Sequence, residues 1–68
     1  METWQGQWEF RNFHMRQDGR KGTTTVSASS EDAAREAVKE KASQELFGTT
    51  SWKTYVQVTH LVNVPKLY

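Results

Sequence analysis

Few residues in this chain could carry out chemistry. His14 and His60 are the only imidazoles among 68 residues, and there is no cysteine. Two histidines far apart in the sequence, with no pair of carboxylates beside them, do not match a zinc or catalytic site. His60 stands in a row of alternating valines, so we expect it in or at the rim of the core. His14 is expected on an open sheet face. The sequence predicts no catalytic residue and no metal ligand.

The acidic residues and the glycines also fit structural roles. Five acids are expected on the solvated outer face of a helix and at its N-terminus, where the helix dipole favours negative charge: Glu31, Asp32, Glu36, Glu40 and Glu45. Gly19 and Gly22 bracket two basic residues but lack the GxxxxGK[ST] pattern of a phosphate-binding loop. We therefore expect a protein that is not an enzyme and that holds no cofactor.

Cationic and aromatic side chains are the more informative feature. Between positions 11 and 21 four basic residues stand against one acid, although the whole chain carries a net charge of only +1. Arginine and aromatic residues dominate the energetics of binding interfaces. The sequence therefore predicts a binding surface composed of Arg11, Phe13, Arg16, Arg20, Lys21, Trp52 and Tyr55. An alternative is that these cations only keep a hairpin edge from pairing.

The aromatic residues outnumber what so small a core needs. We expect Trp8, Phe10 and Phe47 beneath the helix, and Trp4 exposed together with the aromatic members of the predicted surface. The alternative is that these outer rings form one more core layer or a contact between two copies of the chain.

The first half of the chain predicts a β-hairpin. Residues 8–16 alternate and are rich in aromatics, which predicts a strand, and a change of parity near residues 11–12 indicates a β-bulge. Asp18-Gly19 is a strong signal for a hairpin turn. Residues 23–28 then form the returning strand, with Thr24, Val26 and Ala28 facing the core.

The second half predicts a helix followed by a strand. Ser29 and Ser30 are candidates for capping a helix that runs from about residue 31 to 46 or 47 and ends at Gly48. Its apolar stripe is narrow and made mostly of small residues, namely Ala34, Val38, Ala42 and Leu46 with Ala37 beside them. Residues 55–64 predict a strand with Val56, Val58, Val62 and Val64 on one face, which Pro65 ends.

These elements predict an α+β fold: a three-stranded antiparallel sheet in ββαβ order with one helix packed on one face. We expect one small domain over residues 1–68, with its core between residues 8 and 64. A right-handed crossover places the first strand at the centre of the sheet. The helix then covers one face and leaves the other bare, and the last strand is an apolar edge, which favours a homodimer as an alternative.

A resemblance to small protein families adds to this prediction. The segment V-x-A-S-S-E-D-A-A-x-x-A, at residues 26–37, lies between a strand and a valine-rich strand. This pattern resembles small phage-encoded inhibitors, including some anti-CRISPR proteins, and in second place the archaeal ribosomal LX-type protein. The resemblance covers about residues 8–64, rests on cap and core positions, and carries over no site residue. It implies a protein that binds and blocks a host protein or a nucleic-acid machine.

Taken together, the sequence predicts a non-enzymatic binding module with a protein partner. Direct binding of RNA or DNA by the basic, aromatic hairpin and a dimeric structural subunit are the alternatives. No stretch approaches the length of a membrane span, and the N-terminus lacks a basic start followed by an apolar run. We therefore expect a cytoplasmic protein without membrane contact, in the host cytoplasm if it is phage-encoded.

Overall fold

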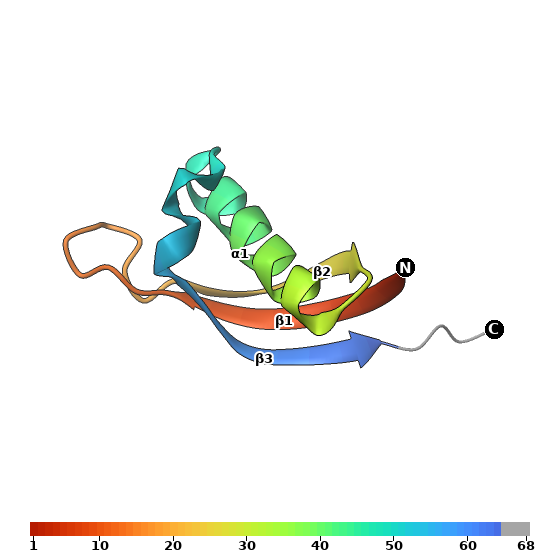
Figure 1. Cartoon of the computed structure of the whole chain (residues 1–68). Coiled ribbons are helices and arrows are strands. Elements are labelled where there is room, and N and C mark those ends of the chain that lie inside the picture. Colours follow the sequence, from red (N-terminus) through yellow and green to blue (C-terminus); the bar gives the residue numbers. More distant parts are fainter. Residues whose placement is uncertain (65–68) are drawn as a thin grey trace.

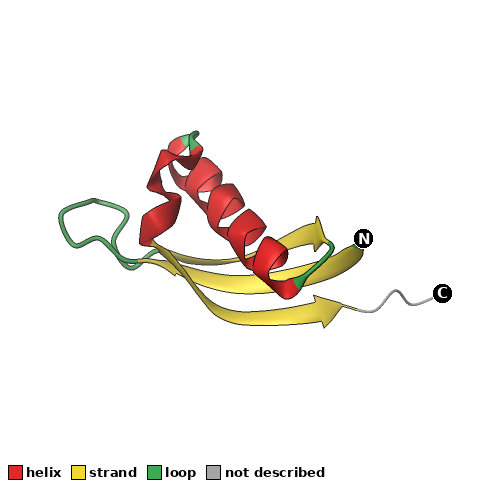
Figure 2. Ribbon diagram, viewed as in Figure 1, coloured by secondary structure: helices red, strands yellow, loops and turns green. Residues whose placement is uncertain are grey.

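The computed structural model describes residues 1–64 and shows the predicted α+β plan (Figure 1). The elements follow in the order β1 (Glu2–Phe10), β2 (Lys21–Ala28), α1 (Glu31–Phe47), the 3-10 helix η1 (Thr50–Tyr55) and β3 (Val56–Val64). The strands form one antiparallel sheet in the order β2-β1-β3, and α1 crosses one face of it, as Figure 2 shows. Pro65, predicted to end the last strand, lies outside the described residues.

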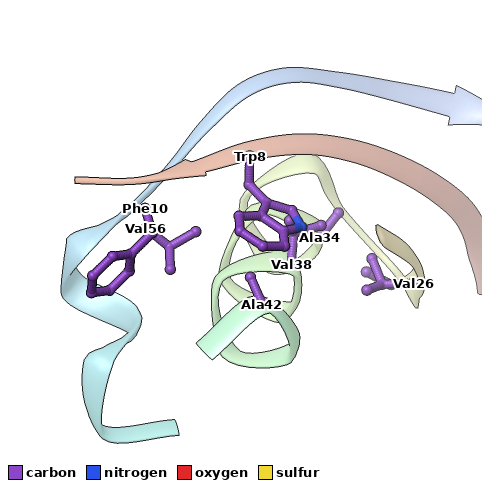
Figure 3. Packing of buried hydrophobic residues seen from close by; sticks show 8 residues of the cluster. Trp8, Phe10, Val26, Ala34, Val38, Ala42 and Val56 are labelled. Atoms are coloured by element: carbon purple, nitrogen blue, oxygen red, sulfur yellow. The ribbon is translucent and has the colours of Figure 1, made fainter. Parts of the chain in front are cut away.

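The core lies between α1 and the central strand. Ala34, Val38 and Ala42 are fully buried against the sheet, as Figure 3 shows. The helix approaches β1 so closely that a Cβ atom at Gly6 would lie only 2.7 Å from Cγ2 of Val38. Trp8 is buried beside them, and its indole N–H donates to the hydroxyl of buried Thr24 over 2.9 Å. Small side chains on the helix and a glycine beneath it therefore give the two layers a thin, dense contact.

Both ends of α1 follow the sequence signals. Ser30 is the N-cap, and its hydroxyl accepts the N–H of Ala33 over 3.2 Å. Gly48 adopts a left-handed conformation with φ of 73°, and its N–H donates to the carbonyl of Gln44 over 2.7 Å. The predicted start, end and terminating glycine are confirmed, and Ser30 is the residue that caps.

The prediction for the first strand was wrong in its position. β1 begins at Glu2 and ends at Phe10, and residues 11–20 form a loop. The change of parity near residues 11–12 therefore marks the end of the strand rather than a bulge. The predicted glycine turn is present, since Gly19 has φ of 84°, but it closes a long connection in which His14 lies on the loop and not on the sheet. Polar side chains in this segment accept hydrogen bonds from backbone N–H groups that would otherwise pair with a neighbouring strand.

A bulge occurs instead in β3. Trp8 pairs with Val58 and Gln7 pairs with His60, so Thr59 has no residue opposite it in β1. The extra residue moves every later side chain to the other face of the sheet. Leu61 consequently packs against the core, whereas Val62 is 55% exposed.

The predicted row of four core valines was therefore wrong beyond position 58. Val56 is buried and Val58 is half-buried against the core, but Val64 points to the uncovered face and is 38% exposed. His60, predicted in or near the core, is exposed for the same reason. The bare face itself matches the prediction, because on β2 the side chains that alternate with the core residues are exposed.

Because of the bulge, we expect a valine-to-aspartate substitution to lower stability much more before Thr59 than after it. Val58→Asp places a charge against the core and should lower stability by about 2 kcal/mol or more, out of a total of roughly 5 for a chain of this size. Val62→Asp places it in water and should stay within about 0.5–1 kcal/mol of the parent. Thermal unfolding followed by circular dichroism measures both. Equal losses in the two variants would contradict the change of face at Thr59.

Candidate functional site

The segment between β1 and β2, residues 11–20, is here called the basic loop. Two hydrogen bonds close its base: Phe10 N–H donates to the carbonyl of Arg20, and Gly19 N–H donates to the carbonyl of Phe10, each over 2.8 Å. Arg11 N–H donates to the carbonyl of Tyr55 over 2.9 Å. The loop is thereby tied to the end of the sheet and to η1, and it projects from the body of the molecule (Figure 1).

Inside the basic loop the backbone is held by successive turns. Met15 N–H donates to the carbonyl of Asn12 over 2.9 Å, and Asp18 N–H donates to the carbonyl of Met15 over 3.1 Å. The carboxylate of Asp18 accepts the N–H of Asn12 over 2.9 Å. The side chain of Met15 packs against the core. These contacts give the loop one defined shape, so the side chains at its surface are positioned before any partner binds.

The basic loop presents an aromatic ring and several cations to solvent. Phe13 is 83% exposed, and its ring lies 4.2 Å from the imidazole of His14, centre to centre. Arg16 and Arg20 are exposed, and Arg20 donates to the side-chain oxygen of Gln17 over 3.2 Å. Arg11 is the one cation of the group with a carboxylate partner, Glu9 at 3.2 Å. The arrangement can engage an anionic surface together with an apolar contact.

Trp52 and Tyr55, the two predicted surface residues outside the hairpin, lie on η1 and belong to an aromatic cluster. Phe10, Phe47, Trp52 and Tyr55 form one cluster, in which neighbouring ring centres lie 5.1 to 6.1 Å apart. Trp52 is half-buried in it, while Tyr55 remains 41% exposed. The prediction that Trp52 is an exposed anchor was therefore wrong.

Trp4 also differs from the prediction. It is half-buried, and its indole N–H donates to the carbonyl of Ala28 over 3.3 Å. A narrow alanine stripe fills only the middle of the space over the sheet, so large rings occupy the space at both ends of α1.

The predicted surface is thus divided. Arg11, Phe13, Arg16 and Arg20 lie together on the basic loop, and Lys21 follows as the first residue of β2. Tyr55 touches this group through the hydrogen bond from Arg11 to its carbonyl. Trp52 is separate from this group, since it is half-buried in the aromatic cluster.

The uncovered face of the sheet holds a hollow that the sequence did not reveal. It has a volume of about 380 Å³ and is lined by Gln7, Trp8, Glu9, Lys21, Gly22, Thr23, Thr59 and His60. Alternation along β1 and β2 places the polar residues of those strands on one face, but His60 joins them only because of the bulge. Side chains here can donate and accept hydrogen bonds.

Neither a metal cluster nor a membrane-spanning helix occurs within residues 1–64. No group of three or more His, Cys, Asp or Glu side chains there could hold a metal ion. No helix in the same range has the length and apolar character needed to cross a bilayer.

Comparison with known proteins identifies no relative: no family model, curated protein or solved structure matches this chain.

One ion pair attaches η1, and with it the base of the basic loop, to α1. The ammonium group of Lys53 lies 3.0 Å from the carboxylate of Glu36. The hydrogen bond and the charge of Lys53 lower the pKa of Glu36, and the same two effects of Glu36 raise the pKa of Lys53. The lowered pKa means that the stabilisation from Glu36 is present above its ordinary pKa and is lost as pH falls through the folded-state value. The raised pKa of Lys53 means that its share is lost only at strongly alkaline pH.

Removing this pair should make stability less sensitive to acid. We expect Glu36→Gln to lower the unfolding midpoint by about one or two degrees at neutral pH, because the pair is exposed and screened by water. The difference from the parent should vanish once the pH lies below the folded-state pKa of Glu36. Glu45→Gln removes one charge from another exposed helical position that has no ion-pair partner among residues 1–64, and it serves as the control for the loss of a carboxylate. A difference that persists in acid would contradict the assignment.

Proposed function

We propose that this chain is a non-enzymatic binding module that contacts an acidic surface of a partner protein through the basic loop. The observation that supports this most directly is the 83% exposure of Phe13 on a loop that its own hydrogen bonds hold in shape. An apolar ring on an ordered loop can bury its area in an interface at a small cost in conformational entropy. Aromatic residues and arginine are enriched in protein interfaces, and Arg11, Arg16 and Arg20 share the basic loop with Phe13.

The distribution of charge supports an acidic partner. The basic loop carries Arg16 and Arg20 without carboxylate partners among residues 1–64, whereas Asp18 uses its carboxylate to hold the backbone. α1 carries five of the eight acidic residues of the chain, whereas the basic loop carries three arginines against one acid, so positive charge is concentrated at the loop end. Complementary charge speeds encounter and orients the two proteins.

Inhibition is the form of this function that the resemblance to phage-encoded inhibitors implies. In that form the module occupies a functional surface of a host protein or nucleic-acid complex, in the host cytoplasm, and blocks it. The small size of the domain suits this role, because a short loop that carries one ring and several cations can enter a site from which larger proteins are excluded.

Direct binding of RNA or DNA is the second candidate, and one observation favours it. The rings of Phe13 and His14 lie 4.2 Å apart, tilted by 37°, on a loop that also carries three arginines, and exposed rings with cations can hold unpaired bases and phosphates. Such binding would weaken steeply with salt in the absence of any protein. Titration of generic single-stranded RNA and DNA at several salt concentrations therefore separates the two candidates.

A photo-reactive residue at position 13 tests the proposal directly. We expect benzoylphenylalanine in place of Phe13 to form a cross-link to one protein in a lysate of the source cells, and the same group in place of Thr25 on the uncovered face to form none. With the cross-linked protein purified, Phe13→Ala and Arg16→Glu should each weaken binding at least about tenfold.

The matched control is a charge reversal on the helix. Lys39→Glu changes the net charge by the same amount as Arg16→Glu and should leave affinity within about threefold. Unfolding midpoints of all variants show that they remain folded. Equal weakening by Lys39→Glu and Arg16→Glu would contradict the placement of the site, and cross-links to nucleic acid alone would favour the second candidate.

A further inference from the structure

Cations from α1 cover part of both outer edges of the sheet. Lys41 donates to the carbonyl of Thr25 on β2 over 3.3 Å, and Arg35 reaches the carbonyl of Val58 on β3 over 3.5 Å. Both carbonyls point away from β1, because the backbone N–H and C=O groups of successive residues in an antiparallel strand point alternately to one side and to the other. An incoming strand would have to displace these side chains, so the edges are blocked at these two positions.

The second half of β3 has no such cover. Thr25 on β2 lies opposite Gln5 on β1, and the carbonyl of Thr25 points away from β1. The N–H and C=O groups of Gln5 therefore point to the other neighbour, β3, where Gln5 lies opposite Val62. The neighbours of Val62, Leu61 and Asn63, therefore turn their N–H and C=O groups to the outer edge. Among residues 1–64 no side chain donates to or accepts from these groups.

The side chains of this segment also favour pairing. β3 contains no Lys, Arg, Asp or Glu over its whole length, from Val56 to Val64. Val62 is 55% exposed and Val64 is 38% exposed, both on the uncovered face. Edge strands that stay unpaired usually carry a charge or a proline within the strand, and this one carries neither.

We propose that a second copy of this chain pairs with β3 through residues 60–64, antiparallel and across a two-fold axis. In this register Leu61 exchanges backbone hydrogen bonds with Asn63 of the partner subunit, and Val62 lies opposite Val62 of the partner subunit. Val64 then lies beside His60 of the partner subunit. The occupant is a second copy because residues 60–64 are self-complementary about Val62: the segment brings no charge against itself, and the outward groups of Leu61 and Asn63 meet those of the same two residues in the second copy.

The contact is small. A ribbon of five residues per chain buries much less than the roughly 1,200–2,000 Å² of a stable interface, so we expect a weak dimer. Pairing yields one continuous six-stranded sheet. Because the two copies run in opposite directions, their basic loops lie at opposite ends of it. The proposal does not depend on the proposed function of those loops.

Sedimentation equilibrium between about 10 μM and 2 mM tests the dimer without any partner. We expect a reversible monomer–dimer equilibrium, and slower amide hydrogen exchange at Leu61 and Asn63 as concentration rises. Val62→Asp and Val62→Lys each place like charges opposite one another and should weaken dimerisation at least about tenfold. An equimolar mixture of the two variants should restore it, which a variant that had merely failed to fold could not do.

The control is Ser27→Asp, an exposed position on β2 outside the proposed contact, which should leave the equilibrium unchanged. A monomer at 2 mM would overturn the proposal. So would a dimer that Val62→Asp and Val62→Lys leave intact, or one that their mixture does not restore. Binding of the cross-linked partner by monomeric Val62→Asp would show that the proposed function stands on its own.

Discussion

The close approach of α1 to β1 is the constraint on which the rest of this structure depends. Val38 packs so closely on β1 that only a glycine, Gly6, fits beneath it. Ala34 and Ala42 extend this contact along the helix. Burial of these small side chains contributes only a modest hydrophobic gain per residue, so dense packing has to supply much of the stability. One helix of this width covers the central strand, and no element within residues 1–64 covers the opposite face.

The thin contact determines where the aromatic residues lie. Trp8 fits beside the alanine stripe because a glycine, Gly22, lies against its ring. The other rings lie further out, with Phe10, Phe47 and Trp52 at the C-terminal end of the helix and Trp4 on the core side of β1. The cluster at the C-terminal end supports η1, and η1 in turn accepts the hydrogen bond from Arg11 at the base of the basic loop. The loop therefore rests on a packed aromatic cluster, which explains how so small a protein holds a projecting segment in shape.

The sequence sufficed for the strand order, the helix with both of its ends, the core face of β2 and the bare face of the sheet. The helix ends and the core face of β2 follow from local signals, namely the serine cap, Gly48 and the alternation of Thr24, Val26 and Ala28. The strand order and the bare face follow from the handedness of the crossover and from the presence of a single helix. The position of β1 and the faces of β3 did not follow. Asn12 and Asp18 stabilise a loop through contacts that depend on its closed shape, and the bulge at Thr59 depends on the pairing of β3 with β1. The change of parity near residues 11–12 marks the end of β1 but does not distinguish a loop from a bulge, and the valines of β3 alternate straight through the bulge at Thr59.

The bulge has consequences well beyond one residue. It brings Leu61 to the core, where its Cδ1 atom would lie 3.3 Å from a Cβ at Gly6, and so contributes to the same close contact that sets the helix. The same shift turns His60 into the polar hollow and exposes Val62 and Val64. A strand with strict alternation would have kept Val62 and Val64 on the core face and would have placed Leu61 on the uncovered face instead. The apolar character of the open edge thus results from the adjustment that lets the second half of β3 fit beneath the helix.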